Sequence, residues 1–341
     1  MLRLSRLSKN FTAVQPKSLH LGHYLGALGP TLRSNDATIS ISDLTYLSNQ
    51  VSQQNLPKNQ GKHQQSAANA GDQSLETAKL VMALRQSLSA TSTDHFLVYR
   101  QSKIPALAEL NWILTCHTRV GDLETLKSDL PAGAEVGQLT SPILAAAEAI
   151  LQTGNLWMTG DDSQSKKTLD FCANLSAHMN GKFSTQVFNT CQTKTHQSIQ
   201  ALQNPQQKMT SDDQNIHNTV LLLDTAKKVT KTLKKSVTDS HPGVEYDLEN
   251  RPGTSNLIEI YSGLLALKDE KLDPESLKDL SKVDFKHLVT EAVVKELSKI
   301  QEHYHQVPDE QVTQLLQTSE SEINWQLAAK IRKIKSVVGL F

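Results

Sequence analysis

Short apolar runs alternate with helical patterns through the first half of the chain. The runs at 37–42, 95–99 and 156–159 have the length of buried β-strands, and helical patterns follow at 76–89, 105–116 and 163–181. Because strand–helix alternation is typical of parallel α/β sheets, we expect that architecture here. Ligands of such sheets bind beyond the carboxyl ends of the strands. Polar residues stand at the expected ends: Asp43, Gln101 and the turn Gly160-Asp161-Asp162.

Strand patterns stop after about residue 212, and helical patterns replace them. These cover 219–236, 256–267, 275–281, 285–305 and 309–338, with turns at 241–243 and 251–253. The predicted fold class is therefore α/β, with a parallel-sheet domain at 15–212 followed by an all-helical C-terminal domain at 213–341. Residues 52–75 are rich in Gln, Asn, Lys, Ser and Gly, which predicts a flexible surface insertion in the first domain.

Composition and charge narrow the class of protein. The chain has 341 residues, of which 38% are hydrophobic, so it is long enough for two domains with packed cores. It carries 35 Lys+Arg and 35 Asp+Glu, and this balance gives no whole-chain case for nucleic-acid binding. A local basic patch remains at Lys227, Lys228, Lys231, Lys234 and Lys235. It is either an RNA contact or the solvated face of a helix.

Cysteine spacing and the length of the apolar runs exclude two further classes. Cys116, Cys172 and Cys191 lack C-x-x-C spacing, which predicts reduced thiols and neither a disulfide framework nor a zinc site. No apolar run reaches the roughly eighteen residues of a membrane-spanning helix, so we expect no membrane partner.

The N-terminal residues have the composition of a mitochondrial targeting segment. Arg3, Arg6 and Lys9 are interspersed with leucines, and no acidic residue occurs before Asp36. Basic, amphipathic segments poor in acidic residues direct proteins to mitochondria. We therefore predict a targeting segment at 1–14 and a location in the mitochondrial matrix. A basic, amphipathic start to a folded protein is the alternative.

The segment His20-Leu21-Gly22-His23 is the first candidate for chemistry. Its two imidazoles flank a glycine at the expected start of a helix, where main-chain N–H groups attract anions. The glycine lets a bulky ligand approach the backbone closely. The segment therefore predicts a phosphate site, and the alternative is a surface turn with two incidental histidines.

Several further stretches carry a family pattern in a fixed order. They are Gln101-Ser102 with Ile104-Pro105, Glu109–Leu114, Val237–Ser240 with Tyr246-Asp247, Arg251–Leu257 and the tail Ala328–Phe341. Together they resemble the class I aminoacyl-tRNA synthetases, most closely the tryptophanyl enzymes, from about Gln15 to Phe341. The resemblance implies a Rossmann-like nucleotide-binding sheet domain, an ATP-dependent tryptophan–tRNA ligase activity and a helical domain that binds the tRNA anticodon.

In that family an H-x-G-H segment and a later K-M-S-K-S loop bind ATP together. His20, Gly22 and His23 match the first segment, and Lys208-Met209-Thr210-Ser211-Asp212 occupies the place of the second. The resemblance implies that His20, His23 and Lys208 act on the phosphates. Its implied ATP contacts are Gln15, Gly22, His23, Gly160, Asp161, Asp162, Ile199, Lys208, Met209, Thr210, Ser211 and Asp212. The implied tryptophan contact is Glu148, and Mg²⁺ is implied as a cofactor of ATP, with no metal ligand predicted in the protein.

Some of these residues also fit a purely structural role. Glu148 fits an exposed helix charge, Ile199 a core strand residue, and the 160–162 turn a helix N-cap. The family also implies three partners, which are L-tryptophan, tRNA(Trp) and a second copy of the chain in a homodimer.

Four departures from the family pattern leave alternatives open. Ser211 and Asp212 replace the second lysine and the final serine of K-M-S-K-S, and the turn Gln15–Ser18 is one residue short. Ala145 and Glu148 stand where a Met and an Asp are usual, and the 160–164 segment has extra residues. A catalytically impaired relative that binds RNA or serves a structural role is therefore the main alternative. A different H-x-G-H nucleotidyltransferase and a tyrosine-specific synthetase are the others.

Overall fold

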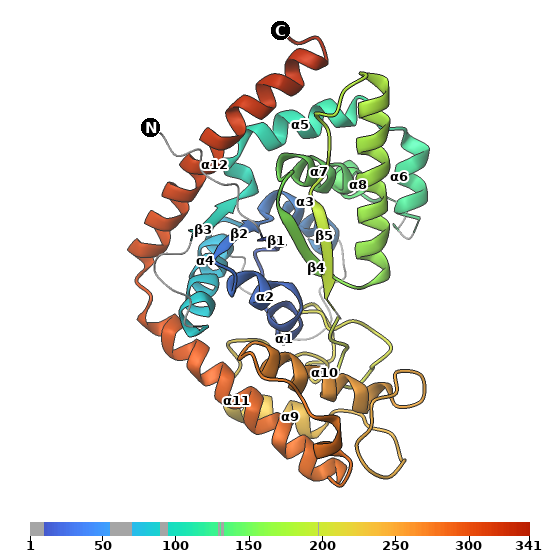
Figure 1. The fold of residues 1–341 in the computed structure, drawn as a ribbon, viewed down its shortest axis with the longest axis vertical. Helices are drawn as coiled ribbons and strands as arrows, with labels where there is room; N and C mark the ends of the chain where they lie inside the picture. Colours follow the sequence, from blue (N-terminus) through green and yellow to red (C-terminus); the bar gives the residue numbers. More distant parts are fainter. Residues whose placement is uncertain (1–9, 55–69, 89–94, 129, 131–132, 197) are drawn as a thin grey trace.

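The computed structural model describes residues 10–54, 70–88, 95–128, 130, 133–196 and 198–341. Its centre is a five-stranded parallel sheet in the order β3-β2-β1-β4-β5 (Figure 1). The strands are β1 (Asn10–Val14), β2 (Asp36–Ile41), β3 (His95–Arg100), β4 (Leu156–Gly160) and β5 (Gln192–His196). The predicted parallel α/β sheet is confirmed, and the three predicted strands lie within one residue of β2, β3 and β4.

The strand β1 lies at the centre of the sheet, between β2 and β4. Phe11 is fully buried, and the Thr12 hydroxyl donates to the Met158 carbonyl oxygen at 2.9 Å. These contacts correct the predicted targeting segment at 1–14, because Asn10–Val14 is part of the folded sheet. The remainder of that segment, residues 1–9, lies outside the described residues.

Besides β1, the edge strand β5 was not predicted from the sequence. β5 has the sequence Gln-Thr-Lys-Thr-His, and four of its five residues are exposed. It pairs only with β4, so it has one free edge and buries little apolar surface. The apolar pattern that identifies a central strand is therefore missing from β5.

Helices cover both faces of the sheet, and each face has its own hydrophobic cluster. The first face carries α1 (Leu21–His23), a π-helical turn (Tyr24–Leu28), α2 (Gly29–Leu32) and α4 (Ala70–Ser87). The second carries α5 (Pro105–Thr115), α7 (Val136–Leu151) and α8 (Ser163–Lys182). The shorter helices α3 (Asp43–Gln54) and α6 (Val120–Leu126) complete this part of the fold. The predicted insertion at 52–75 needs correction at both ends, because 52–54 close α3 and 70–75 open α4, while 55–69 lie outside the described residues.

The last third of the chain is helical, as predicted. It contains α9 (Ala226–Lys234), α10 (Pro252–Ala266), a 3₁₀ turn (Pro274–Leu277), α11 (Lys282–Gln306) and α12 (Asp309–Val337). Pro252 at the first position of α10 and the Ser281 cap of α11 explain where these helices begin. The predicted pattern at 219–236 was too long, because before Ala226 the chain forms a β-bridge between Leu221 and His20 and then a turn.

The helical part is not one separate body, because its last two helices return to the sheet domain. α11 packs against α4, and α12 packs against β3 and α5 (Figure 1). Arg100 at the end of β3 pairs with Glu320 of α12 at 2.7 Å, and Ile323 of α12 is buried in the second cluster. The predicted boundary at 212/213 lies after the last strand, which ends at His196, and α12 belongs by its packing to the sheet domain. In the part of the chain that the structure describes, no helix has the length and apolarity needed to cross a membrane.

Candidate active site

A cavity of about 390 Å³ lies at the carboxyl ends of β1 and β4. From β1 the chain continues to β2 and β3 on one side of the sheet, and β4 and β5 lie on the other side. Ligands of open parallel sheets bind where the strand order reverses in this way. The predicted residues that line it are Gln15, His20, Gly22, His23, Gly160, Ile199, Lys208, Met209 and Thr210. The structure therefore brings both predicted signature segments together in one cavity.

His20 and His23 form a closely packed pair at the start of the first helix. The Nδ1 atom of His20 accepts from the Gly22 amide at 3.1 Å, and the His20 amide donates to Nδ1 of His23 at 3.3 Å. The two ring centroids lie 3.7 Å apart. Since both Nδ1 atoms accept, the remaining Nε2–H group of each ring is a donor.

Both histidines of this pair are neutral at pH 7. Burial, together with the charges of His23, Lys17 and Lys208, holds the pKa of His20 well below its usual value. Burial and the same two lysines lower the pKa of His23 to about 3. The pair therefore offers uncharged hydrogen-bond donors to a ligand, and the positive charge of the cavity comes from lysines.

Two glycines keep the cavity open. A Cβ atom on Gly22 would lie 3.1 Å from the His20 ring and 3.5 Å from Cβ of Ile199. A Cβ atom on Gly160 would lie 3.0 Å from the Ser198 hydroxyl oxygen and 3.3 Å from Nζ of Lys208. A Cβ atom at either place would force these side chains to shift by a few tenths of an ångström, so glycine favours the open form of the cavity.

The second signature segment lies on a hairpin. The Met209 amide donates to the Ile199 carbonyl oxygen at 3.0 Å, and Gln200 forms an antiparallel β-bridge with Lys208. Ile199 and Met209 are both buried, which confirms a core position for Ile199 at the wall of the cavity. Lys208 is exposed at the hairpin end, and its Nζ lies 2.7 Å from Oδ2 of Asp162.

Asp162 has two roles at the turn after β4. It caps α8 by accepting from the Ser165 amide at 3.0 Å, and it holds Lys208. Although burial alone would raise the pKa of Asp162, the hydrogen bonds from Lys208 and Ser165 lower it. The neighbouring Asp161 pairs with Lys166 at 2.8 Å. The N-cap alternative for this turn is therefore confirmed, and it coexists with a place beside the cavity.

Ser198 is one of several residues of the cavity that were not predicted from the sequence. The Ser198 side chain is 7% exposed, lines the cavity, and its hydroxyl has no hydrogen-bond partner among the described residues. A buried polar group without a partner is costly, so a ligand atom is the natural partner. A single serine carries no sequence signal of this kind, and only the three-dimensional arrangement reveals it.

Glu148 lies apart from this cavity. Its Oε1 accepts from the Ser40 hydroxyl at 2.5 Å and from the Tyr99 hydroxyl at 2.9 Å, and its Oε2 accepts from Gln101 Nε2 at 2.9 Å. Burial raises the pKa of Glu148, and these three donors oppose the rise. The residue is 3% exposed, so the exposed-charge alternative is wrong.

Three of the carboxylate's roughly four acceptor positions are thus used inside the protein. Glu148 is not among the residues that line the cavity, and its implied contact with tryptophan stays a prediction. Gln101 belongs to this internal network, whereas Asp43 accepts from the neighbouring Ser102 amide at 2.9 Å.

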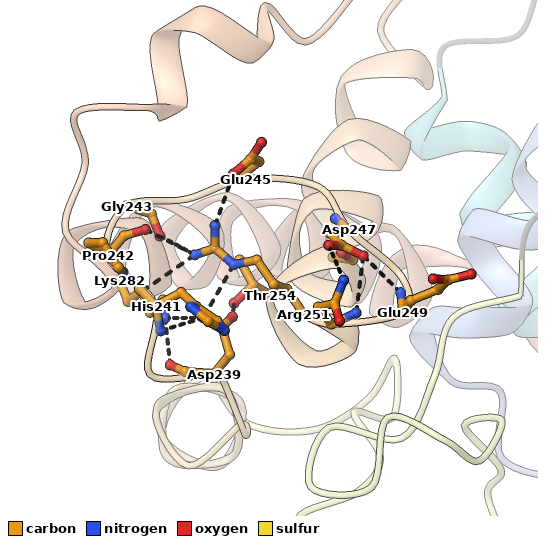
Figure 2. A network of polar contacts seen from close by, with 12 residues as sticks. Asp239, His241, Pro242, Gly243, Glu245, Asp247, Glu249, Arg251, Thr254 and Lys282 are labelled. Carbon is orange, nitrogen blue, oxygen red and sulfur yellow. Dashed lines mark hydrogen bonds and ion pairs between the residues drawn. The ribbon is translucent and has the colours of Figure 1, made fainter.

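The helical-domain signature forms a network of polar contacts around Arg251 (Figure 2). Arg251 reaches the Gly243 carbonyl oxygen at 2.6 Å and the Asp239 carboxylate at 3.2 Å. Asp239 also pairs with Lys282 at 2.5 Å and accepts from the Thr254 hydroxyl at 2.5 Å. Although burial alone would raise the pKa of Asp239, these hydrogen bonds lower it strongly. The network fixes the loop before α10 and the start of α11.

The predicted basic patch lies on and just after α9. Lys227, Lys231, Lys234 and Lys235 are exposed, and the partly buried Lys228 pairs with Asp224 at 2.7 Å. The structure thus presents four cations to solvent on one short helix and its end.

The cavity fits ATP better than it fits a metal ion bound by the protein alone. The unpartnered Ser198 hydroxyl, the room left by both glycines and the two lysines at its wall, Lys17 and Lys208, suit a polyphosphate nucleotide. The carboxylates beside it are engaged by lysines. Among the described residues no group of three or more His, Cys, Asp or Glu is arranged to hold a metal ion, so Mg²⁺ would be held largely by the phosphates of ATP.

Comparison with known proteins identifies the family. The family described as tRNA synthetases class I (W and Y) matches residues 8–298. The tryptophan–tRNA ligase of Oceanobacillus iheyensis is 32% identical over 268 residues, covering 74% of this chain and 79% of that protein. The enzyme of Caldanaerobacter subterraneus subsp. tengcongensis is 27% identical over 345 residues, covering 98% and 99%.

Solved structures agree with the fold. The tryptophanyl-tRNA synthetase of Mycoplasma pneumoniae superposes with a TM-score of 0.83 at 20% identity, covering 98% of both chains. That of Campylobacter jejuni, in complex with ADP and tryptophan, gives 0.67 at 19% identity, covering 97% and 99%. The family match and the sequence relatives together place the chain in the class I tRNA synthetases, in the family of the tryptophan–tRNA ligases.

Proposed function

We propose that the protein activates L-tryptophan with ATP to tryptophanyl-adenylate and transfers the amino acid to tRNA(Trp). The observation that carries this proposal is the meeting of both signature segments at one cavity beyond β1 and β4. The names of the sequence relatives support tryptophan as the amino acid. The Campylobacter enzyme, which holds ADP and tryptophan, supports a nucleotide site in this fold.

In the activation step, a carboxylate oxygen of tryptophan forms a bond to the α-phosphorus of ATP. The bond from that phosphorus to the pyrophosphate oxygen breaks, and the leaving group takes the electron pair. Negative charge grows on the pyrophosphate, so donors fixed beside it stabilise the transition state more than the ground state. Mg²⁺ bound with ATP would neutralise part of the same charge.

Different groups of the chain bind the phosphates and make room for the nucleoside. Lys208 supplies a cation, and His20 and His23 supply neutral Nε2–H donors, which avoids placing a titrating base beside the carboxylate. Gly22 and Gly160 leave room for the nucleoside. None of these groups forms a covalent bond to substrate, since the tryptophan carboxylate is itself the nucleophile.

The exposed lysines of α9 support an RNA contact in the helical part. A patch of lysines on a chain with zero formal net charge attracts phosphates locally and gives salt-dependent binding. Family resemblance also supports a homodimer, which sedimentation of the purified chain tests: a single species at the monomer mass would contradict it.

We place the protein in the mitochondrial matrix. Arg3, Arg6 and Lys9, with no acidic residue before Asp36, support this location. The full chain with a C-terminal fluorescent tag should accumulate in mitochondria, and the Arg3→Glu/Arg6→Glu variant should not. A cytosolic signal for the unchanged chain would contradict the location and leave the enzymatic proposal intact.

Amino-acid-dependent exchange of pyrophosphate into ATP tests the enzymatic proposal. Tryptophan should support exchange, and tyrosine at the same concentration should not. Tyrosine-dependent exchange would favour the tyrosyl branch, and exchange driven by a small molecule other than an amino acid would favour a different nucleotidyltransferase.

A second function is favoured by specific observations. Glu148 is engaged inside the protein, and Ser211 and Asp212 leave the second signature with a single lysine. Both fit a relative that has kept the fold and binds RNA without catalysis. Absence of exchange at saturating tryptophan and ATP, with tRNA binding retained, would establish this alternative.

A further inference from the structure

The second signature segment is short of positive charge. In Lys208-Met209-Thr210-Ser211-Asp212 a serine stands in the place of the family's second lysine, and Asp212 adds a negative charge. A triphosphate with a growing charge on its leaving group needs fixed cations nearby. The hairpin alone provides only Lys208.

Another lysine lies at the wall of the same cavity. Lys17 belongs to the turn between β1 and the first helix, and it lines the cavity together with His20, His23 and Lys208. The Lys17 amide donates to the Gln15 carbonyl oxygen at 2.8 Å, which closes a tight turn and places the side chain beside the signature helix. Its side chain is 17% exposed.

The Lys17 ammonium also contacts Asp212, at the end of the second segment that departs from the family pattern. Its Nζ lies 2.9 Å from Oδ2 of Asp212, whose side chain is 56% exposed. An exposed ion pair of this kind contributes only about 0–1 kcal/mol. A polyphosphate carries several charges and strong acceptors, so it can take Lys17 away from Asp212.

We propose that Lys17 is the second phosphate-binding cation of this site and takes the place of the lysine that the second signature segment lacks. Asp212 holds Lys17 at the cavity wall until a nucleotide binds. The inference rests on the proposed use of ATP, but it concerns nucleotide binding and can be measured without turnover. Lysine suits the task because its ammonium is a compact charge that binds phosphate without a fixed orientation.

Equilibrium binding of ATP and of adenosine to the full chain, measured by calorimetry, tests the proposal. Lys17→Ala should weaken ATP binding by ~10-fold or more, the loss of a charged hydrogen bond, and should change adenosine binding by less than ~2-fold. Lys17→Arg should retain most of the affinity. Asp212→Asn should strengthen ATP binding several-fold, since it removes both the competitor for Lys17 and a repulsive charge. Lys333→Ala, an exposed lysine of α12, is the matched control.

The second-site variant Ser211→Lys makes the test specific. Adding it to Lys17→Ala should restore most of the ATP affinity, because it returns a cation to the hairpin. Unchanged ATP affinity in Lys17→Ala, or no rescue by Ser211→Lys, would overturn the proposal, and thermal melting confirms that each variant is folded. A wild-type chain that binds ATP but shows no tryptophan-dependent exchange would contradict the proposed function alone. A wild-type chain that binds no ATP would contradict both the proposed function and the role of Lys17.

Discussion

Asn256 holds both main-chain groups of Gln200. Its Oδ1 accepts from the Gln200 amide at 2.8 Å, and its Nδ2 donates to the Gln200 carbonyl oxygen at 2.9 Å. Gln200 forms the antiparallel β-bridge with Lys208 across the hairpin. Through these two bonds, α10 of the helical part fixes the register of the segment that carries Lys208.

Replacing Asn256 by alanine should loosen the Lys208 hairpin. We expect the KM for ATP to rise by about 10-fold, the effect of two lost hydrogen bonds of about 1 kcal/mol each, reduced by hydration of the freed groups. Asn256→Asp keeps the acceptor and loses the donor, so it should lie between wild type and alanine. Asn174→Ala, an exposed residue of α8, is the control. An unchanged KM for ATP in Asn256→Ala would show that the hairpin keeps its shape without this clamp.

The Arg251 network should contribute to stability more than to catalysis. Arg251 is 5% exposed and contacts Asp239 and the Gly243 carbonyl (Figure 2). Arg251→Ala removes one partner of the partly buried Asp239, which keeps Lys282 and Thr254, so we expect the free energy of unfolding to fall by about 1–3 kcal/mol. Urea denaturation measures the loss. Arg251→Lys should recover only part of it, because an ammonium cannot reach several carbonyls at once.

The variant Glu148→Gln distinguishes a structural role of Glu148 from recognition of tryptophan. Glu148→Gln replaces one acceptor oxygen by an NH2 group, so either Gln101 or the Ser40 and Tyr99 hydroxyls lose their acceptor, and the free energy of unfolding should fall by about 1–3 kcal/mol. If the residue is only an internal brace, the KM for tryptophan should change by less than ~2-fold when measured well below the melting temperature. A KM for tryptophan raised ~10-fold or more, with little change in stability, would instead show direct recognition of the amino acid.

The histidine pair should make the protein sensitive to mild acid. The pKa of His23 is about 3 in the folded protein and about 6.5 when unfolded, so between these values the unfolded chain binds more protons. Stability should therefore fall as the pH drops below about 6.5. For His23, which is partly exposed, the loss at pH 5.5 should not exceed about 1 kcal/mol. His23→Gln should reduce the difference in unfolding free energy between pH 7 and 5.5, and an unchanged difference would show that His23 does not cause it.

The sequence alone located the signature residues that line the cavity because both signatures are local patterns. His20, Gly22 and His23 lie within four consecutive residues, and Lys208 and Met209 are consecutive, so each group could be recognised without knowledge of the fold. Parallel-sheet geometry then predicted that strand ends would meet, and Gly160 does lie at the cavity.

Features that depend on distant contacts could not be predicted. β1 resembled part of a basic leader because its burial comes from two neighbouring strands far along the chain. Asp43 and Gln101 stand at strand ends as expected, yet neither lines the cavity: Gln101 donates to Glu148, and Asp43 accepts from Ser102. The ion pair of Lys17 and Asp212 joins residues 195 positions apart, and no sequence pattern encodes it.

Tryptophan-dependent exchange of pyrophosphate into ATP by the wild-type chain and by His20→Ala tests the central claim most directly. The wild type should exchange, and His20→Ala should lose at least ~100-fold of the rate, since it removes a donor placed for the transition state. His20→Ser keeps a helix cap and should still be inactive, which separates the imidazole from the cap. His287→Ala, an exposed histidine of α11, should behave as wild type. Equal exchange rates in wild type and His20→Ala would contradict the assignment of this cavity as the active site.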